Sequence, residues 1–159
     1  METKTNVMRI LDAHHVPYKS YTYDVASAPS GDAVAAALHQ NPAQVFKTLV
    51  TVARSGNHYV FMIPVCSELD LKRAATAVHE KSIDMLKQRD LLGLTGYIHG
   101  GCSPIGMKKQ FKTVADASAN NFATIIFSAG RPGYQVEISP TDLSKLIPLS
   151  FSDVCISQN

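Results

Sequence analysis

The sequence has no hydrophobic run long enough to cross a membrane, and little cysteine. Its first fifteen residues, METKTNVMRILDAHH, are polar and helix-like and lack the apolar stretch of a secretory signal peptide. Cysteine occurs only at Cys66, Cys102 and Cys155, without C-x-x-C spacing, and the odd number excludes complete internal pairing. These absences predict a reduced, cytoplasmic setting and no membrane partner.

Charge is also scarce. Charged residues make up 18% of the chain and the net charge is +2, which permits a nucleic-acid partner without indicating one. The six histidines are scattered, with no spacing typical of metal ligands, so we expect no metal ion. No motif of an organic cofactor is present, and no repeat, linker or low-complexity segment divides the chain.

What is present is the composition of one globular domain over residues 1–159, with 45% hydrophobic residues. Periodicity and capping residues predict helices at 5–15, 28–40, 67–80, 82–92 and 139–147. Their expected N-caps are Thr5, then Ser30 or Asp32, then a Ser67–Asp70 capping box, and then Ser82. Strands are expected at 16–24, 44–54, 58–65, 122–128, 134–139 and 149–156. This irregular interleaving favours an α/β (α+β) domain with a mixed sheet and flanking helices.

Lys47 is the most informative single residue, because it interrupts the strand QVFKTLVTV. Both faces of that strand are mostly apolar, which predicts a central strand covered on both sides. A lysine in such a place either extends to solvent at the strand end or stands in a cleft as a fixed cation. The second alternative would provide a contact for an anionic or carbonyl-bearing ligand.

The stretch GYIHGGCSPIGMKKQF, residues 96–111, is too rich in glycine for a regular helix or strand. Main-chain N–H groups at Gly100 and Gly101 can approach a ligand closely, and such donors suit a carbonyl oxygen or a developing oxyanion. The spacing of Gly101 and Gly106 is that of a phosphate-binding loop, but Met107 occupies the position of its lysine. Nucleotide hydrolysis is therefore disfavoured.

Other side chains give weaker signals. Cys102 has no base near it in the sequence, and we interpret it as a packing residue. Ser128 precedes a glycine turn and fits either turn chemistry or the rim of a binding site. Lys108 and Lys109 fit a solvated pair or a phosphate contact.

The segments VFKTLV, LDLKRAA, GYIHGGCSPIGMKK, FATIIFSAGRPG and VEISPTDL together resemble the YbaK family of aminoacyl-tRNA deacylases, the prolyl-tRNA synthetase-associated editing domains. The resemblance extends from the first helix to about residue 155. The chain is most similar to the free-standing branch that acts on Cys-tRNA(Pro) and Cys-tRNA(Cys). The resemblance implies a single-domain, mixed and curved β-sheet with flanking helices, the YbaK-like fold.

The resemblance also implies the functional residues. Lys47 would engage the 3′-terminal nucleotide of the charged tRNA, and Gly101 would share the catalytic role. The positions of the substrate-binding pocket would be Tyr23, Ser30, Gly100, Ser128 and Gly130. Cys-specific members are thought to use the substrate's own thiol, which attacks the ester and leaves as a cyclic thiolactone, so no catalytic triad is expected.

Two positions depart from the family pattern: Ser30 replaces an aromatic residue, and Gln135 replaces a common acidic one. Both bear on amino-acid specificity. The leading hypothesis is a trans-editing deacylase that clears Cys from tRNA(Pro), with the 3′ acceptor end and prolyl-tRNA synthetase as partners and no DNA. The alternatives are an Ala-tRNA(Pro) deacylase and a non-catalytic module that binds tRNA or synthetase.

Overall fold

The computed structural model describes residues 3–157; the ends of the expected domain, 1–2 and 158–159, lie outside the described residues. The helices of the described chain are α1 (Asn6–Ala13), α2 (Gly31–Ala37), α3 (Leu71–Ala77), α4 (Gln88–Thr95), α5 (Pro140–Leu146) and a 3-10 helix, η1 (Ala117–Asn121). The strands are β1 (Lys19–Thr22), β2 (Phe46–Ala53), β3 (His58–Pro64), β4 (Ile83–Met85), β5 (Thr113–Asp116), β6 (Ile125–Ser128), β7 (Tyr134–Ile138) and β8 (Leu149–Ser152). None of the helices in residues 3–157 has the length and apolarity needed to span a bilayer.

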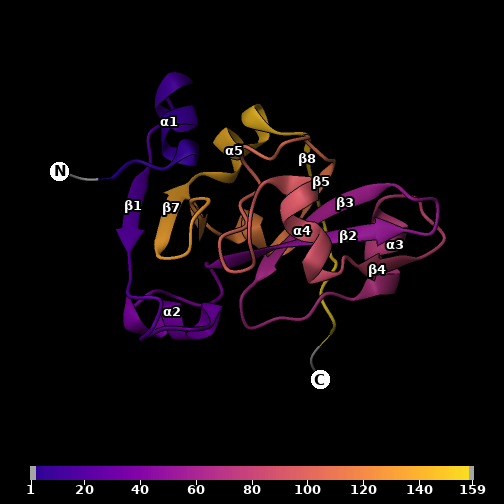
Figure 1. The fold of residues 1–159 in the computed structure, drawn as a ribbon. Helices are drawn as coiled ribbons and strands as arrows, with labels where there is room; N and C mark the ends of the chain where they lie inside the picture. The colour runs from indigo at the N-terminus through magenta and orange to yellow at the C-terminus, as the bar shows by residue number, and fades with distance from the viewer. Residues whose placement is uncertain (1–2, 158–159) are drawn as a thin grey trace.

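The strands form two sheets rather than the single sheet that was expected. One has the order β4-β2-β3-β5-β8 and is mixed, because β3, β5 and β8 run parallel while β4, β2 and β3 alternate. The other is antiparallel, with the order β1-β7-β6. Figure 1 shows the smaller sheet beside the larger one, with α1 and α2 near its opposite ends. The predicted α+β class with helices around a mixed sheet is confirmed.

The two sheets are joined at a single point in the described chain. An isolated parallel bridge pairs Val45, just before β2, with Ile126 of β6. The amide of Ile126 donates to the carbonyl of Gln44 at 3.1 Å. Both sheets also contribute side chains to one main core.

The main core lies between the sheets. One face of β2 and β3 packs there through Phe46, Val50 and Met62, together with α1, α5 and the partly buried leucines of α4. The opposite face of β2 and β3 is covered by α3 through Ala74 and Ala75. β2 is therefore an interior strand with apolar residues on both faces, as the sequence predicts. A third, small cluster under α2 holds Ala35, Val45 and Ile126.

Helix boundaries follow the capping residues in most places. Thr5, Ser30 and Ser139 each accept a hydrogen bond from an amide in the first turn of α1, α2 and α5. The cap of α3 is Asp70 and not Ser67. The Asp70 carboxylate accepts from the amides of Lys72 and Arg73, and its negative charge suits the positive end of a helix.

The helix predicted at 82–92 with Ser82 as its cap is wrong in its first half. Residues Ile83–Met85 instead pair with β2 as the edge strand β4, and the side chain of Ile83 is buried against α3. The helix begins only at Gln88, after a Lys87 that makes no side-chain cap. Pairing with an otherwise open sheet edge outweighs a local helical pattern here.

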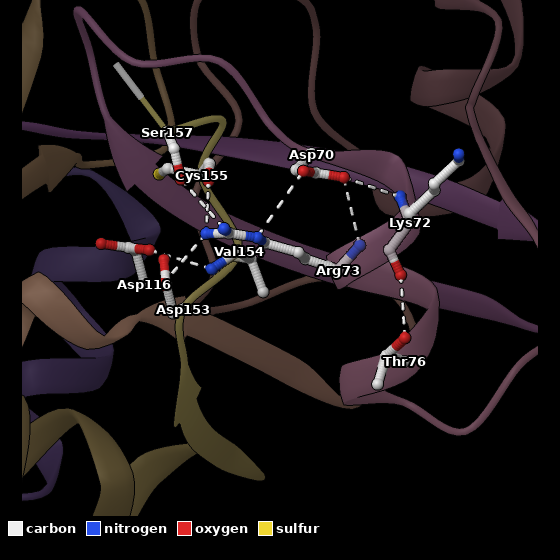
Figure 2. A network of polar contacts seen from close by, with 9 residues as sticks. All are labelled: Asp70, Lys72, Arg73, Thr76, Asp116, Asp153, Val154, Cys155 and Ser157. Carbon is white, nitrogen blue, oxygen red and sulfur yellow. Dashed lines mark hydrogen bonds and ion pairs between the residues drawn. The ribbon is translucent and has the colours of Figure 1, made fainter. Parts of the chain in front are cut away.

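Arg73 of α3 binds the segment after β8, as Figure 2 shows. The Arg73 guanidinium contacts the Asp153 carboxylate at 3.0 Å, the Cys155 carbonyl at 3.1 Å and the Ser157 hydroxyl at 2.9 Å. Beside it, the Val154 amide donates to the buried Asp116 carboxylate. These contacts stabilise the fold, because they hold the segment after β8 against α3 and β5.

Candidate functional site

Lys47 and Ser128 both follow the bridge that joins the two sheets. The bridge between Val45 and Ile126 sets a parallel register, and Lys47 and Ser128 each follow two residues later. Since residues two apart share a face of a strand, both side chains lie on the α2 side of the molecule. Both are partly exposed. The strands therefore bring together a cation and a hydroxyl that are far apart in the sequence.

A row of polar side chains continues from Ser128 across the small sheet. Ser128 pairs with Gln135 of β7, and Gln135 pairs with Tyr21 of β1. Directly paired residues point to the same face, so this row faces α2 as well. Gln40, which follows α2, donates from Nε2 to the Oε1 of Gln135 at 2.8 Å. The Oε1 of Gln40 is buried and has no hydrogen-bond partner among residues 3–157.

The start of α2 covers the Lys47 end of this row. Ser30 caps the helix, and the pKa of Asp32 is lowered by hydrogen bonding to Ser30, by backbone amides and by the charge of Lys47. The charge of Lys47 is the smallest of these causes, and it acts on a carboxylate in the first turn of α2. Gly31 is required there, because a Cβ would lie 2.8 Å from the Cγ1 of Val65.

The turn between β6 and β7, residues 129–133, gathers the other predicted residues. Tyr23 donates its amide to the Gly133 carbonyl at 3.0 Å. The amide of Gly130 donates to the Ser128 hydroxyl at 3.2 Å, and Gly130 has a φ of 96°. Gly101 lies against the same turn, since a Cβ on it would come within 2.6 Å of Pro132. Four predicted residues thus border one hairpin turn.

Gly100 and Gly101 lie in a bend after α4, which we call the glycine bend. Its main-chain N–H groups are not arranged as the sequence predicts. The amide of Gly101 donates to the Ile98 carbonyl at 3.0 Å, so it is engaged inside the bend. The amides of Gly100 and Cys102, on either side, donate to no group in the described chain. Gly100 is exposed and has a φ of 86°, which favours glycine. The open donors are therefore the neighbours of Gly101.

Cys102 behaves as a packing residue, as its sequence context indicates. It packs against the main core, and burial raises the pKa of its thiol to about 12. Such a thiol stays protonated near neutral pH and is a poor nucleophile. Within residues 3–157, no cluster of histidine, cysteine or acidic side chains is arranged to hold a metal ion.

Two hollows on the described surface lie away from these residues. One, of about 410 Å³, is bordered by Pro64, Cys66, Asp116 and Cys155, and the other, of about 490 Å³, lies between α3 and Asp153. Neither is lined by Lys47, Ser128 or the glycine bend. The second borders Arg73, which already serves the fold. We therefore base the candidate site on the predicted residues that border the hairpin turn, with Lys47 on the α2 side, and not on the depth of a cavity.

Sequence reasoning missed two residues of this arrangement. Asp32 was considered only as a helix cap, although its charge faces Lys47. Gln40 drew no attention, because a glutamine after a helix is ordinary. A buried acceptor without a partner costs about 1–3 kcal/mol, which marks Gln40 as a place where a donor on a bound substrate would be stabilised. Only the strand register, which the sequence does not specify, reveals it.

Comparisons with known proteins identify the family and the fold. A curated protein of Enterococcus faecalis (strain ATCC 700802 / V583), named as a candidate Cys-tRNA(Pro)/Cys-tRNA(Cys) deacylase, EbsC, is 43% identical over 154 residues, which cover 96% of this chain and 94% of the relative. The crystal structure of a candidate trans-editing enzyme for prolyl tRNA synthetase aligns with a TM-score of 0.82 at 20% identity, covering 98% and 100% of the two chains. The hypothetical protein APE2540 aligns with a TM-score of 0.84 at 20% identity, covering 94% and 99%.

At that level of identity the two solved structures establish the fold alone. The family match is more direct, because residues 26–146 fit the aminoacyl-tRNA editing domain. This span includes Ser30, Lys47, both glycines of the bend and the whole β6–β7 hairpin. The chain belongs to the aminoacyl-tRNA editing domain family.

Proposed function

We propose that this protein is a trans-editing deacylase that removes cysteine from mischarged Cys-tRNA(Pro), and also acts on Cys-tRNA(Cys). The observation that carries the proposal is the 43% identity, along nearly the whole length of both chains, with a relative named for that activity. The family match supports it, and so does the packing of Gly101 against the hairpin turn that follows Ser128. One domain carries the activity, which belongs in the cytoplasm, where aminoacyl-tRNA is used.

In this proposal the Lys47 ammonium holds the 3′-terminal nucleotide of the tRNA. Its position near the start of α2 suits an anionic or oxygen-rich ligand, since its field already acts on Asp32. The hydroxyl of Ser128 accepts a hydrogen bond from Gly130, so its own proton remains free to be donated to the substrate. Together they orient the ester.

The chemical step that we propose uses the substrate's thiol. The sulfur of the cysteinyl group bonds to its own carbonyl carbon, the bond from that carbon to the ribose oxygen breaks, and the thiol proton passes to the ribose oxygen. The products are a cyclic thiolactone and free tRNA. Open amides at Gly100 and Cys102 would stabilise the negative charge that develops on the carbonyl oxygen. An internal attack gains a high effective concentration when the site selects the reactive conformer.

The experiment compares three substrates: Cys-tRNA(Pro), Ala-tRNA(Pro) and Pro-tRNA(Pro). We expect rapid loss of the cysteinyl ester and slow loss of the other two, with the thiolactone detected by mass spectrometry of the quenched reaction. Faster clearance of the alanyl ester would assign the protein to the Ala-specific branch. Binding of tRNA without clearance of any ester would refute the proposed deacylase activity. It would indicate a non-catalytic module that binds tRNA.

We also propose that prolyl-tRNA synthetase provides tRNA selectivity by docking beside the deacylase. One solved structure with the same fold is that of a candidate trans-editing enzyme for prolyl tRNA synthetase, which supports the pairing. Purified synthetase should increase the preference for tRNA(Pro) over tRNA(Cys) in the deacylation assay. An unchanged preference at saturating synthetase would argue against docking.

A further inference from the structure

The positive charge of the chain is concentrated in one segment. Residues 87–112 carry five cationic side chains, Lys87, Arg89, Lys108, Lys109 and Lys112, and one acidic side chain, Asp90, for a net charge of +4. The whole chain has a net charge of +2, so the remaining residues together carry −2. A small net charge therefore conceals a strong local asymmetry.

Two of these side chains, Arg89 and Lys108, lie along α4. The amide of Lys108 donates to the Thr95 carbonyl, and its ammonium lies 3.5 Å from the Gly93 carbonyl. The side chain of Lys108 thus runs along the last turn of α4. Arg89 precedes Gly93 by four residues and so lies one turn away on the same face of the helix. We call the surface formed by α4 and residues 107–112 the α4 surface.

The cations of the α4 surface are exposed, and acidic groups hardly offset them. In the described chain the only ion pair that involves one of these cations joins Arg89 to Asp90 at 4.0 Å, with both side chains mostly in solvent. The ammonium of Lys109 lies 5.9 Å from the centre of the Phe111 ring, and no carboxylate contacts it within residues 3–157. These charges remain available to a partner.

The chain connects α4 directly to the candidate site. The bend that leaves α4 passes through Ile98, whose carbonyl accepts the amide of Gly101. Gly101 in turn packs against Arg131 and Pro132 of the hairpin turn. The bend that follows α4 therefore reaches the turn between β6 and β7.

We propose that the α4 surface binds the backbone phosphates of the tRNA acceptor arm while the 3′ end occupies the site beside Lys47. This inference rests on the proposed function. RNA phosphates form a dense, regular line of negative charge, and proteins bind double-stranded RNA through phosphates and 2′-hydroxyls more than through bases. Contact of this kind explains how a chain with little net charge holds a large polyanion. It also predicts weak dependence on the sequence of the stem.

The test uses the double variant Arg89→Glu/Lys109→Glu, which spares Lys108 and its contact with α4. The matched control is Lys72→Glu/Lys81→Glu, which makes the same change of charge at exposed lysines on and just after α3. Three readouts are compared: kcat/KM on full-length Cys-tRNA(Pro), the rate on 3′-cysteinyl adenosine, and the Kd for uncharged tRNA(Pro) at several salt concentrations.

We expect the Arg89/Lys109 variant to lose about tenfold or more in kcat/KM on the full tRNA and to keep its rate on the short substrate. Its log Kd should rise less steeply with log salt, by about one unit of slope for each cation removed. Values for the full tRNA equal to those of the control variant would overturn the proposal, and so would equal losses on both substrates. Normal tRNA binding with lost binding of synthetase would instead identify a protein-docking surface and would also overturn it.

The proposed function and the α4 surface can fail separately. If the wild-type protein clears neither substrate, the deacylase assignment fails. The Kd for uncharged tRNA still decides whether the α4 surface binds RNA, because that measurement requires no turnover.

Discussion

Val45 and Ile126 pair in a parallel bridge that joins the two sheets at one point. Lys47 and Ser128 each follow this bridge by two residues, on the side of the molecule that carries α2. The bridge also brings the β6–β7 turn, against which Gly101 packs, to the same end of the molecule. One backbone contact thus fixes the strand that carries the cation relative to the strand that carries the hydroxyl.

Gly101→Ala is expected to abolish activity by moving the bend. Its Cβ would lie 2.6 Å from Pro132 Cδ and 2.9 Å from the Pro132 nitrogen, so the hairpin turn must shift. We expect a loss of at least about 100-fold in kcat, as small displacements of positioned groups cause. Gly93→Ala, at a position with open space inside α4, is the matched control. Similar activity of the two variants would show that close packing of the bend does not matter.

Cys102→Ala should leave deacylation within about twofold of the wild type. Burial raises the pKa of the thiol to about 12, so it cannot serve as a thiolate near pH 7. The measurement is the rate on Cys-tRNA(Pro) before and after the substitution, with circular dichroism to verify folding. A folded variant without activity would make Cys102 a participant in the reaction.

Glu137→Gln is expected to lower the melting temperature at pH 7 and to lose this effect in acid. The pKa of Glu137 is raised by burial, but hydrogen bonds from Thr124 and Tyr21 outweigh burial and leave it below its ordinary value of 4.5. A lowered folded-state pKa stabilises the protein above the unfolded-state value, and the contribution disappears as pH falls through the folded-state value. Melting curves of both proteins between pH 7 and pH 3 test this, and a constant difference would contradict it.

His15→Gly should raise the melting temperature by about 2–4 °C, corresponding to about 1 kcal/mol. His15 follows α1 with a φ of 57°, where a side chain is strained and glycine is not. His14→Gly is the control. Its φ of −95° suits any residue, so glycine there should only destabilise. Equal shifts for the two variants would mean that backbone strain at His15 is negligible.

The sequence predicted most of the fold because local signals and burial agree there. The strand containing Lys47 is interior and apolar on both faces, and the hairpin of residues 122–139 forms as its turn residues indicate. Prediction failed where distant pairing decides the structure. Residues 83–85 pair with β2, and Thr113–Asp116, which was not predicted as a strand, inserts between β3 and β8.

The candidate site was only partly accessible to sequence reasoning. Individual residues such as Lys47 and Gly100 are conspicuous because they break a local pattern. Their mutual arrangement depends on the Val45–Ile126 bridge, which joins residues 81 positions apart, and no local signal encodes it. The hydrogen bond that occupies the Gly101 amide was invisible for the same reason, since glycine composition does not reveal which amide points inward.

The central claim is that the Lys47 ammonium holds the charged 3′ end of the tRNA for cleavage. Its most direct test is single-turnover deacylation of Cys-tRNA(Pro) by wild-type protein and by Lys47→Ala, with melting curves for both. We expect a loss of at least about 100-fold and a melting temperature within about 2 °C of wild type, because the side chain is partly exposed and packs little. A folded Lys47→Ala protein that clears the ester at the wild-type rate would contradict the claim.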